Sequence, residues 1–512
     1  MRTLLLATLL FFSCGYSAGL AAQISLDTTT VDTTQVQIDH ANQLEFIQRG
    51  DQVVQRLQGD VGLSQDSIYM YCDTATIENS TRVFAIGDEV LIQQGDSLAA
   101  FADTLYYDGE LKEAELIGNV ILINRERKLF TERLHYNLRT KLATYETPAT
   151  ITDGETQLSS KRGYYYTDSG DIYFKDSVIV IHPEFQLRAD TLKFNTNQQL
   201  ATFLGPTVMR TDSTRIYCED GFYDVENNVA EFRQNAQYER GEQRATADII
   251  RYDGENKVYT LDGNADFQQG DTREATGDLI VYDAVNDITI LEGDAYFRDQ
   301  EQVITGESIR YDAKKKVYKT SGRSRIVDGA QILQADQVDF SEQDSLGIAS
   351  GNVTWQDTST NLIIQCDTAA YSQTTGYLKA TGGNRGRPLL ITLIDNDSLY
   401  LAADTLLSLR STDTLASDSS RLLLAYNDVR IYKSNMQALC DSVAYNSADS
   451  LFRLFRSPII WADTSQFTAD TINLQLANGS LDKIFLYRNS FILNSPDEVF
   501  YNQIKGRDIV AS

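Results

Sequence analysis

Apolar and polar residues alternate along most of this chain, in short runs that are separated by turn sequences. In ADTLYYD (102–108), Leu105 and Tyr107 stand two and four positions after the acidic residue Asp103. A period of two predicts a half-buried β-strand. After the turn DGEL, a second alternating run surrounds Gly118, and its residues of one parity are Ala114, Leu116, Val120 and Leu122. We therefore predict a unit of two strands with one apolar face and one polar face.

The same unit recurs along the chain at a nearly constant spacing. Its marker is an acidic residue followed four positions later by an aromatic or large apolar residue, and examples are Asp103/Tyr107, Glu132/Tyr136, Asp190/Phe194, Asp248/Tyr252, Asp278/Tyr282, Glu307/Tyr311 and Asp336/Phe340. Successive markers between Tyr107 and Tyr371 lie 28–31 residues apart. A fixed period of this kind indicates a repeat architecture.

A two-strand unit cannot bury its apolar face alone, but a stack of about fourteen units can. We therefore predict an all-β fold, an elongated antiparallel two-sheet β-jelly-roll built from two-strand repeats of ~29 residues. If each unit adds one strand to each sheet, a strand spacing of ~4.8 Å gives a length on the order of 70 Å.

Two polar features recur at fixed places in the unit. A glycine followed by Asn or Asp stands in the middle of the second strand, as at Gly118, Gly263 and Gly293. Glycine weakens a strand unless it serves a bend or a close approach, so we expect these strands to bend at one height. The acidic residue, which we place at a strand start, is expected to accept hydrogen bonds from backbone N–H groups. The chain lacks the Gly-rich nonapeptides of a calcium-binding β-roll, and we predict no metal site.

The composition fits a folded repeat protein and argues against some partners. The 512 residues are 42% hydrophobic and include only 6 prolines, which suits a buried core and long strands. The formal net charge is −27. Binding to nucleic acid or to anionic head groups requires a basic surface, so the charge argues against both.

The N-terminal residues have the pattern of a secretory signal peptide. One arginine precedes the apolar run LLLATLLFF (4–12), and small residues follow in SAGLAAQ (17–23). We predict cleavage near Ala22. Cys14, with Phe11 three positions before it, fits a lipoprotein box poorly, and acylation at this cysteine is the alternative. The apolar run is too short to span a membrane.

The predicted organisation is a signal peptide (1–22), a flexible N-terminal segment (23–44) and one continuous roll (45–512), with regular units to about residue 381, looped units over 382–440 and final units over 441–512. The spacing between Asp367, Asp404 and Asp441 lengthens to 37 residues. The extra residues lie in GGNRGRPLLI (382–391) and STDTLASDSS (411–420), whose composition predicts loops.

Few residues suit catalysis or cross-linking. Four cysteines each precede an acidic marker residue: Cys72, Cys218, Cys366 and Cys440. The nearest two lie more than one unit apart, which is too far for a disulfide, so we predict buried unpaired thiols. The three histidines, His40, His135 and His182, have no metal-binding spacing, and no phosphate-binding loop or nucleophile motif occurs. We therefore predict that the protein is not an enzyme and holds no cofactor.

The inward parity of the repeats carries a column of large apolar residues. The candidates for a hydrophobic groove are Leu116, Val120, Leu122, Phe194, Phe203, Tyr252, Phe267, Tyr282, Phe297, Tyr311, Phe340 and Trp355. Two interpretations stay open at this point. Either these side chains pack a dry core, or they line an apolar trough that is open along one side and accepts alkyl chains.

The repeat resembles that of a known family. ADTLYYD…AELIGNVIL (102–122), ADIIRYD…YTLDGNADF (247–267) and ADQVDFS…GIASGNVTW (335–355) are similar to the repeat of the OstA-like (organic solvent tolerance) domain of lipopolysaccharide-transport proteins. The resemblance covers about residues 45–510, and the length is similar to that of long Bacteroidetes-type members. It implies a periplasmic, non-enzymatic bridge that carries lipopolysaccharide by its acyl chains, through a hydrophobic groove, toward the outer membrane.

The resemblance also implies partners, because rolls of this family join end to end. The unpaired strand edges at the two ends of a roll are templates for pairing with another strand. We expect other lipopolysaccharide-transport jelly-roll proteins to pair there, with end-to-end self-association as a further option and no binding of nucleic acid. The alternatives are a structural or adhesive repeat protein with a dry core and no lipid ligand and, with less support from the residues, an enzyme built on a β-solenoid.

Overall fold

The computed structural model describes residues 35–50, 52–96, 98–372, 374–383, 386–394, 397–410, 421–477, 480–497 and 499–511. Within these ranges every regular element is a β-strand, and the all-β prediction is confirmed. The predicted signal peptide and the predicted loop at 411–420 lie outside the described residues. The segment 23–44, predicted to be flexible, contains a strand at Gln37–His40 and the start of another at Gln43.

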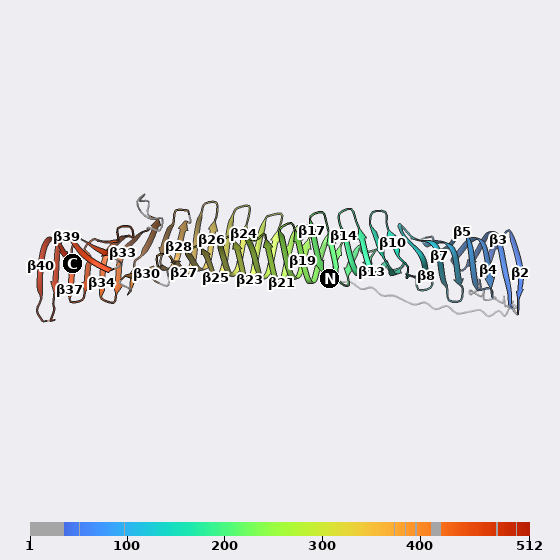
Figure 1. Cartoon of the computed structure of the whole chain (residues 1–512), viewed down its shortest axis with the longest axis horizontal. Helices are drawn as coiled ribbons and strands as arrows, with labels where there is room; N and C mark the ends of the chain where they lie inside the picture. Colours follow the sequence, from blue (N-terminus) through green and yellow to red (C-terminus); the bar gives the residue numbers. More distant parts are fainter. Residues whose placement is uncertain are drawn as a thin grey trace, which may run out of the picture.

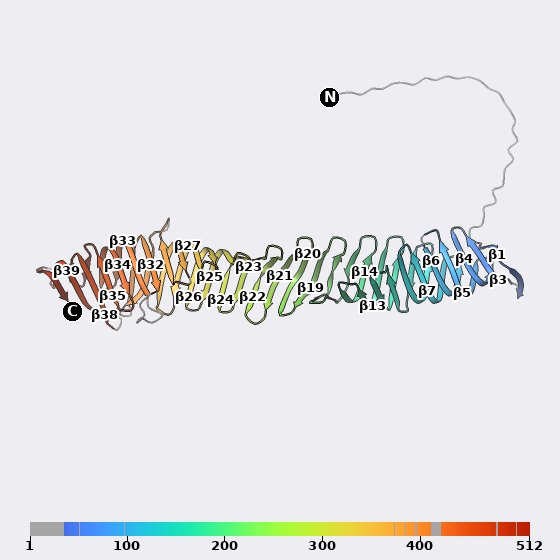
Figure 2. The ribbon, with the colours of Figure 1, turned by 90° about the horizontal axis from the view of Figure 1, so that it is seen from above.

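The strands of the first half of the chain are β1 (Gln37–His40), β2 (Gln43–Arg49), β3 (Gln52–Gln65), β4 (Ile68–Glu78), β5 (Arg82–Gln94), β6 (Leu98–Asp108), β7 (Glu113–Asn124), β8 (Arg127–Asn137), β9 (Leu142–Tyr145), β10 (Ala149–Thr152), β11 (Gln157–Ser160), β12 (Arg162–Tyr166), β13 (Asp171–Ile181), β14 (Gln186–Asn195), β15 (Leu200–Phe203), β16 (Thr207–Arg210), β17 (Thr214–Cys218), β18 (Asp220–Asp224), β19 (Val229–Arg240) and β20 (Gln243–Asp253). Those of the second half are β21 (Val258–Gln269), β22 (Arg273–Asp283), β23 (Ile288–Asp299), β24 (Gln302–Asp312), β25 (Val317–Asp328), β26 (Gln331–Ser341), β27 (Leu346–Asp357), β28 (Leu362–Ser372), β29 (Tyr377–Thr381), β30 (Leu389–Ile394), β31 (Asp397–Ala402), β32 (Thr405–Arg410), β33 (Arg421–Lys433), β34 (Met436–Asn446), β35 (Leu451–Phe455), β36 (Ile459–Ala462), β37 (Ser465–Thr468), β38 (Thr471–Ala477), β39 (Ser480–Asn494) and β40 (Asn502–Ala511). They form one elongated roll, with β2 and β3 at one end and β39 and β40 at the other (Figure 1), and the view from above shows the same order (Figure 2).

We call one passage of the chain across the roll a row; it is either one long strand or two short strands in line. Each row pairs with the rows before and after it in the sequence. β21, for example, pairs antiparallel with β20 on one side and with β22 on the other. Some rows are interrupted at mid-length and comprise two named strands, such as β15 and β16, which both pair with β14. Nine rows are of this kind, so the 40 named strands form 31 rows in the described part of the chain.

Each row crosses both layers of the roll, because the sheet folds along a line through the middle of its strands. β21 pairs with β22 on both sides of a register shift between Asp262 and Ala265, and comparable shifts recur in the other long pairs. One unit therefore adds two strands to each layer, and not one. The predicted length of ~70 Å is too short, since 31 rows at ~4.8 Å correspond to roughly 150 Å.

The bend brings the two recurring polar features together. Gly263 and Asn264 have φ values of +76° and +48° and form a two-residue bulge in β21. Asp248, in the middle of β20, lies opposite this bulge and accepts a hydrogen bond from Asn264 Nδ2 (2.9 Å). The same contact joins Asn119 to Asp103 (3.0 Å) and Asn352 to Asp336 (2.9 Å). The predicted bend at a common height is confirmed.

The position and partners of the acidic residue differ in part from the prediction. Asp103 lies at mid-strand in β6, not at a strand start, because the alternation continues through the bend with a shift of one residue. A backbone N–H is the donor at Asp73, which accepts from the amide of Asp88 (2.9 Å). At the Gly-Asn bulges the donor is a side-chain amide instead.

The apolar parity faces inward, as predicted. Ala114, Leu116, Val120 and Leu122 are each at most 1% exposed. Buried apolar side chains form one core cluster that extends from Val36 to Ile492. The core therefore runs along nearly the whole described length of the roll.

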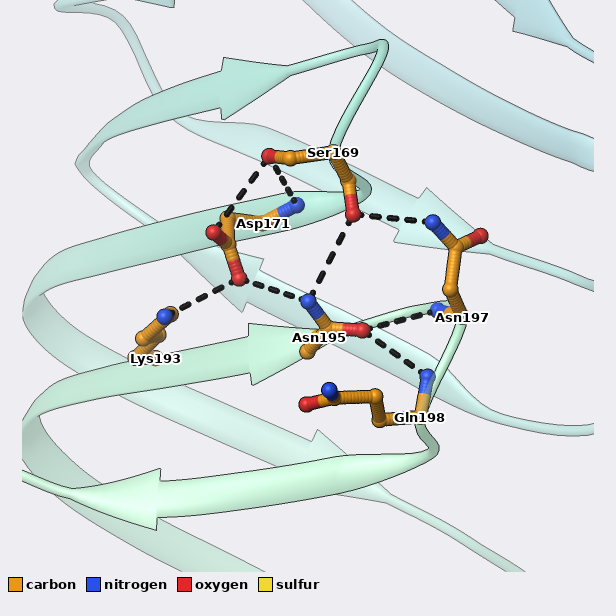
Figure 3. Close-up of polar contacts among 6 residues, drawn as sticks. All are labelled: Ser169, Asp171, Lys193, Asn195, Asn197 and Gln198. Carbon is orange, nitrogen blue, oxygen red and sulfur yellow. Dashed lines mark hydrogen bonds and ion pairs between the residues drawn. The ribbon is translucent and has the colours of Figure 1, made fainter.

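Turns on one edge of the roll are tied to each other by polar side chains. Asn195, the last residue of β14, accepts hydrogen bonds from the backbone N–H groups of Asn197 (3.0 Å) and Gln198 (2.8 Å) and donates to Asp171 on β13 (2.7 Å) (Figure 3). Lys193 forms an ion pair with Asp171 (3.0 Å). We call this edge, with turns at 109–112, 138–141, 196–199, 254–257 and 284–287, the tyrosine rim. The opposite edge, where Gln65, Gln94 and Gln269 end their strands, is the glutamine rim.

The turn carboxylates of the tyrosine rim predict a loss of stability in acid. The pKa values of Asp224, Asp253 and Asp283 are lowered, first by a hydrogen bond from an Asn side chain three residues later and then by the backbone N–H of that Asn. Because the folded pKa lies below the unfolded value of 3.8, the stabilisation is present above about pH 4 and is lost as the pH falls through the folded pKa. We expect the melting temperature to fall less steeply between about pH 5 and pH 3 in the triple variant D224N/D253N/D283N.

Asparagine preserves the turn itself, because Asn137 and Asn195 accept the equivalent backbone hydrogen bonds in this chain (2.8 Å each). The matched control is E226Q/E255Q, which removes charges at two of the same turns without removing these bonds. Circular dichroism melts of the three proteins, at several pH values, give the slope of melting temperature against pH. Identical slopes for the triple variant and the parent would contradict the stabilising role of the three turn carboxylates.

Candidate functional site

The interior of the roll is the candidate site, and the predicted groove residues lie on its wall. Six of them are buried: Leu116, Val120, Leu122, Phe203, Phe340 and Trp355. Five are half-buried and pack against the core: Phe194, Tyr252, Phe267, Phe297 and Tyr311. Tyr282 is 36% exposed and stacks on Tyr259 with ring centroids 6.3 Å apart. The half-buried positions cluster between residues 194 and 311, so the interior is not equally covered along its length.

Hydrogen bonds between the two rims close the N-terminal part of the interior. The side chain of Gln65, on the glutamine rim, donates to the carbonyl of Gly109 on the tyrosine rim (3.1 Å) and accepts from the hydroxyl of Tyr107. Two further contacts of this kind join Gln94 to the carbonyl of Leu138 (3.3 Å) and Asn124 to the hydroxyl of Tyr165 (2.7 Å). These bonds, which we call the N-terminal clamps, connect opposite ends of strands that lie three rows apart. The two rims therefore meet here.

A buried ion pair closes the roll again toward the C-terminal end. Arg421 begins β33 on the tyrosine rim, and Asp357 ends β27 on the glutamine rim. The guanidinium Nη2 and Nε lie 3.0 Å from the same carboxylate oxygen, and the two residues are 9% and 3% exposed. The guanidinium also donates to the carbonyl of Gly376 (3.4 Å) and lies over the ring of Trp355, 5.1 Å from its centroid. We call this group the C-terminal clamp.

Between the clamps, aromatic side chains meet across the interior. Ring centroids lie 5.9 Å apart for Phe185 and Tyr223, 6.3 Å for Tyr238 and Tyr259, and 6.4 Å for Phe297 and Tyr311. In each pair, one ring comes from the half-sheet of the glutamine rim and the other from that of the tyrosine rim. All six side chains are half-buried, and we call them the aromatic seam.

Polar contacts do not cross the seam region. Over residues 200–327, all of which the structure describes, no hydrogen bond or ion pair joins the two rims. Gln269 and Asp299 occupy the strand-end positions that carry the clamps elsewhere. Both instead accept a hydrogen bond from Arg273 on their own rim: Nη1 donates to Oε1 of Gln269 (3.5 Å) and Nη2 to Oδ2 of Asp299 (2.8 Å). Burial raises the pKa of Tyr259 to about 12, and its neighbours Tyr252 and Tyr238 add to this shift, so the hydroxyl of Tyr259 stays protonated at neutral pH.

The clamps were not predicted from the sequence, although the sequence carries a signal for them. Gln65, Gln94, Asn124 and Asp357 each continue the inward parity of their strand at its last position. A polar residue at an inward position requires a partner when it is buried. The sequence does not say whether that partner lies on the same rim or on the opposite one, because this depends on how the sheet folds.

The cysteines follow the prediction. Cys72, Cys218 and Cys440 are buried, Cys366 is half-buried, and none of the four forms a disulfide. Burial raises the pKa of each thiol to about 12, with a further contribution from the acidic residues beside it. These thiols are therefore protonated and packed as small core residues. Cys14 lies outside the described residues.

No other constellation in the described residues suggests chemistry. No group of three or more His, Cys, Asp and Glu residues there is placed to hold a metal ion. His40 and His135 lie on exposed strand faces, near Asp60 (3.6 Å) and Glu113 (3.9 Å). A hollow of about 700 Å³ is lined by exposed side chains such as Tyr106 and His135 and by the buried Val83 and Tyr107. Within the described ranges, no helix of the length and apolarity needed to cross a membrane is present.

The two ends of the roll expose a strand edge together with apolar side chains of the core face. At one end, β1 and β2 pair only with β3, and Leu44 and Phe46 are 47% and 64% exposed. At the other end, β40 pairs only with β39, and Ile504 is 54% exposed. In the described part of the chain, both terminal rows thus lack a second neighbour.

Comparison with known proteins relates this geometry to one family. Residues 33–190 and 255–367 match the model of the OstA-like protein family, and residues 157–273 match the model described as LptA/(LptD N-terminal domain) LPS transport protein. Among solved structures, LptH, the LptA homologous periplasmic component of the lipopolysaccharide transport device from Pseudomonas aeruginosa, is 22% identical, with 20% of this chain and 75% of that chain covered and a TM-score of 0.18. No curated protein matches the chain.

Proposed function

Because the chain belongs to the OstA-like protein family, whose model matches more than half of its residues, we propose that it is a lipopolysaccharide carrier of the periplasm. In this proposal the roll binds lipopolysaccharide by its acyl chains and conducts it toward the outer membrane, as a part of outer membrane assembly. The match of residues 157–273 to an LPS transport family supports the proposal. The same match is to a transport family and not to an enzyme family.

The observation that carries the proposal is the form of the core. The apolar face runs along nearly the whole described roll, and its middle part is lined by half-buried side chains such as Tyr252, Phe267 and Phe297. Each methylene group of an acyl chain that leaves water contributes about 0.8 kcal/mol. Contact with several equivalent rows therefore holds a lipid without any single deep site, which suits a carrier.

The two exposed strand edges suit the junctions of a bridge. In the proposal, the edge of β2 or β40 pairs with the edge strand of another lipopolysaccharide-transport jelly-roll protein or of a second copy. Leu44, Phe46 and Ile504 would then continue the apolar interior across the junction. Export by the signal peptide at 1–22 and the division of the roll into regular and looped units belong to the same proposal.

Photo-crosslinking in cells tests the carrier function. A photoreactive amino acid is placed at Phe267, which faces the interior, or at Asp266, its outward-facing neighbour on β21. We expect adducts with lipopolysaccharide from position 267 and a much weaker signal from position 266, because only the first side chain contacts acyl chains. Immunoblots for protein and for lipopolysaccharide identify the adducts.

The outward position is the matched control, since both variants lie on one strand and experience the same export and folding. Adducts at neither position, in a folded and exported protein, would contradict the carrier function. That result would favour the alternative, a structural or adhesive repeat protein with a dry core. The fully buried rings of Tyr136, Tyr145 and Phe174 in the N-terminal part are the observation that favours this alternative.

A further inference from the structure

The two rims of the roll are held together by two different kinds of contact. At the N-terminal and C-terminal clamps, buried polar groups bond across the rims, as Gln65 does to Gly109 and Arg421 to Asp357. At the aromatic seam, aromatic rings meet across the interior, and over residues 200–327 no hydrogen bond or ion pair joins the two rims. The difference determines which part of the roll separates with the smaller free-energy cost.

Opening a clamp leaves polar groups without partners. Gln65 is 2% exposed and Asp357 is 3% exposed, and an alkyl chain that enters between the rims supplies neither donors nor acceptors. Lipid insertion at a clamp therefore exchanges buried hydrogen bonds for none. The clamps are expected to stay closed in the presence of lipid.

Opening the seam has no such cost. The rings of Tyr238 and Tyr259 contact each other across the interior, and an inserted alkyl chain replaces apolar contact by apolar contact. Two polar strand-end residues of this section, Gln269 and Asp299, contact Arg273 on their own rim and not the opposite rim. The rims of this section can therefore part without breaking a polar contact between them.

We propose that the aromatic seam is a lateral entrance through which acyl chains pass between the rims into the interior, and that the clamps confine this entrance to the central part of the roll. This inference rests on the proposed carrier function and adds the place of loading. Lipid then reaches the interior from the side, between the half-sheets that carry the aromatic seam, and need not enter at an open end of the roll.

Reversible cross-linking of the full chain tests the entrance. All five cysteines are first replaced by alanine, and two cysteines are introduced by Y238C/Y259C at the seam. A short bis-maleimide with a reducible spacer then links the half-sheets. The probe is lipopolysaccharide that carries a fluorescent acyl chain, and its transfer to the purified protein is measured by fluorescence and native gel. We expect the link to reduce uptake by about tenfold or more relative to the same variant with capped thiols, and reduction of the spacer to restore it.

A pair within one rim supplies the matched control. R82C/D108C links paired residues of β5 and β6 on the tyrosine rim and does not join the two rims, so uptake is expected to match that of its own capped form. Equal uptake by the linked and capped seam variants overturns the entrance, as does an equal loss when R82C/D108C is linked. If the parent protein takes up no lipopolysaccharide at all, the carrier function fails together with the entrance.

Discussion

Replacing Arg421 by methionine is expected to destabilise the C-terminal part of the roll by about 3–5 kcal/mol. Methionine fills much of the space of the arginine side chain but leaves Asp357 without its partner at 3% exposure. The carboxylate then lacks both bonds of 3.0 Å from the guanidinium, and Trp355 loses the cation over its ring. The penalty arises chiefly from a charge that stays buried without compensation.

Hydrogen exchange of β27 and β33 is the suitable measurement, because a long repeat protein can lose one section before the others. The exposed pair of Arg82 and Asp108 (3.3 Å) provides the control, and R82M is expected to cost at most about 1 kcal/mol. In the double variant D357L/R421M, most of the lost protection should return, since no unpaired charge remains. A cost for R421M as small as that for R82M would contradict the role of the clamp.

Replacing Gly263 by alanine is expected to destabilise the rows around β21 by about 2–4 kcal/mol. The residue has a φ of +76°, and a Cβ atom there would lie 2.3 Å from Oδ2 of Asp248. Part of the cost is the left-handed backbone, and the rest is displacement of Asp248 from its hydrogen bond with Asn264. Because the same bend recurs in many rows, this value indicates how strongly each bend is specified.

Gly241 separates the two contributions. Its φ is +57°, but nothing lies within 4 Å of a Cβ atom built there. G241A should therefore cost only the backbone part, about 1–2 kcal/mol. In the background D248A, the additional cost of G263A should shrink to a similar value, as a double-mutant cycle can show. Equal effects of G241A and G263A in the parent would exclude a role for the contact with Asp248.

The sequence predicts the inward face of the roll well and its folding line only in part. Leu116 and Val120 on either side of Gly118 keep one parity, so the core residues follow from alternation alone. The strand boundaries do not follow from alternation. The pattern around Asp103 continues through the bend with a shift of one residue, so in the sequence the bend resembles the start of a strand. The doubled length of the roll follows from this error.

The candidate site was predictable as a column of residues but not as an entrance. Phe267 and Leu116 have the same inward parity, yet one is half-buried and the other is fully buried. This difference depends on whether the rims three rows apart are joined by side chains such as Gln65 or by rings such as Tyr238. Such contacts depend on the stagger of the folded sheet, which the periodicity of one strand does not contain.

The pairing of every row with its sequence neighbours has a consequence for the order in which the chain folds. During synthesis the chain emerges from its N-terminus, and each new row meets its partner as soon as it is complete. Even the hydrogen bond from the Arg127 side chain to the carbonyl of Thr196 (3.2 Å) joins residues only 69 positions apart. Growth by addition to one end avoids the slow search for distant partners that delays most β-proteins. A partial chain that already contains several rows is thus a shorter roll, and its last strand is the template for the next.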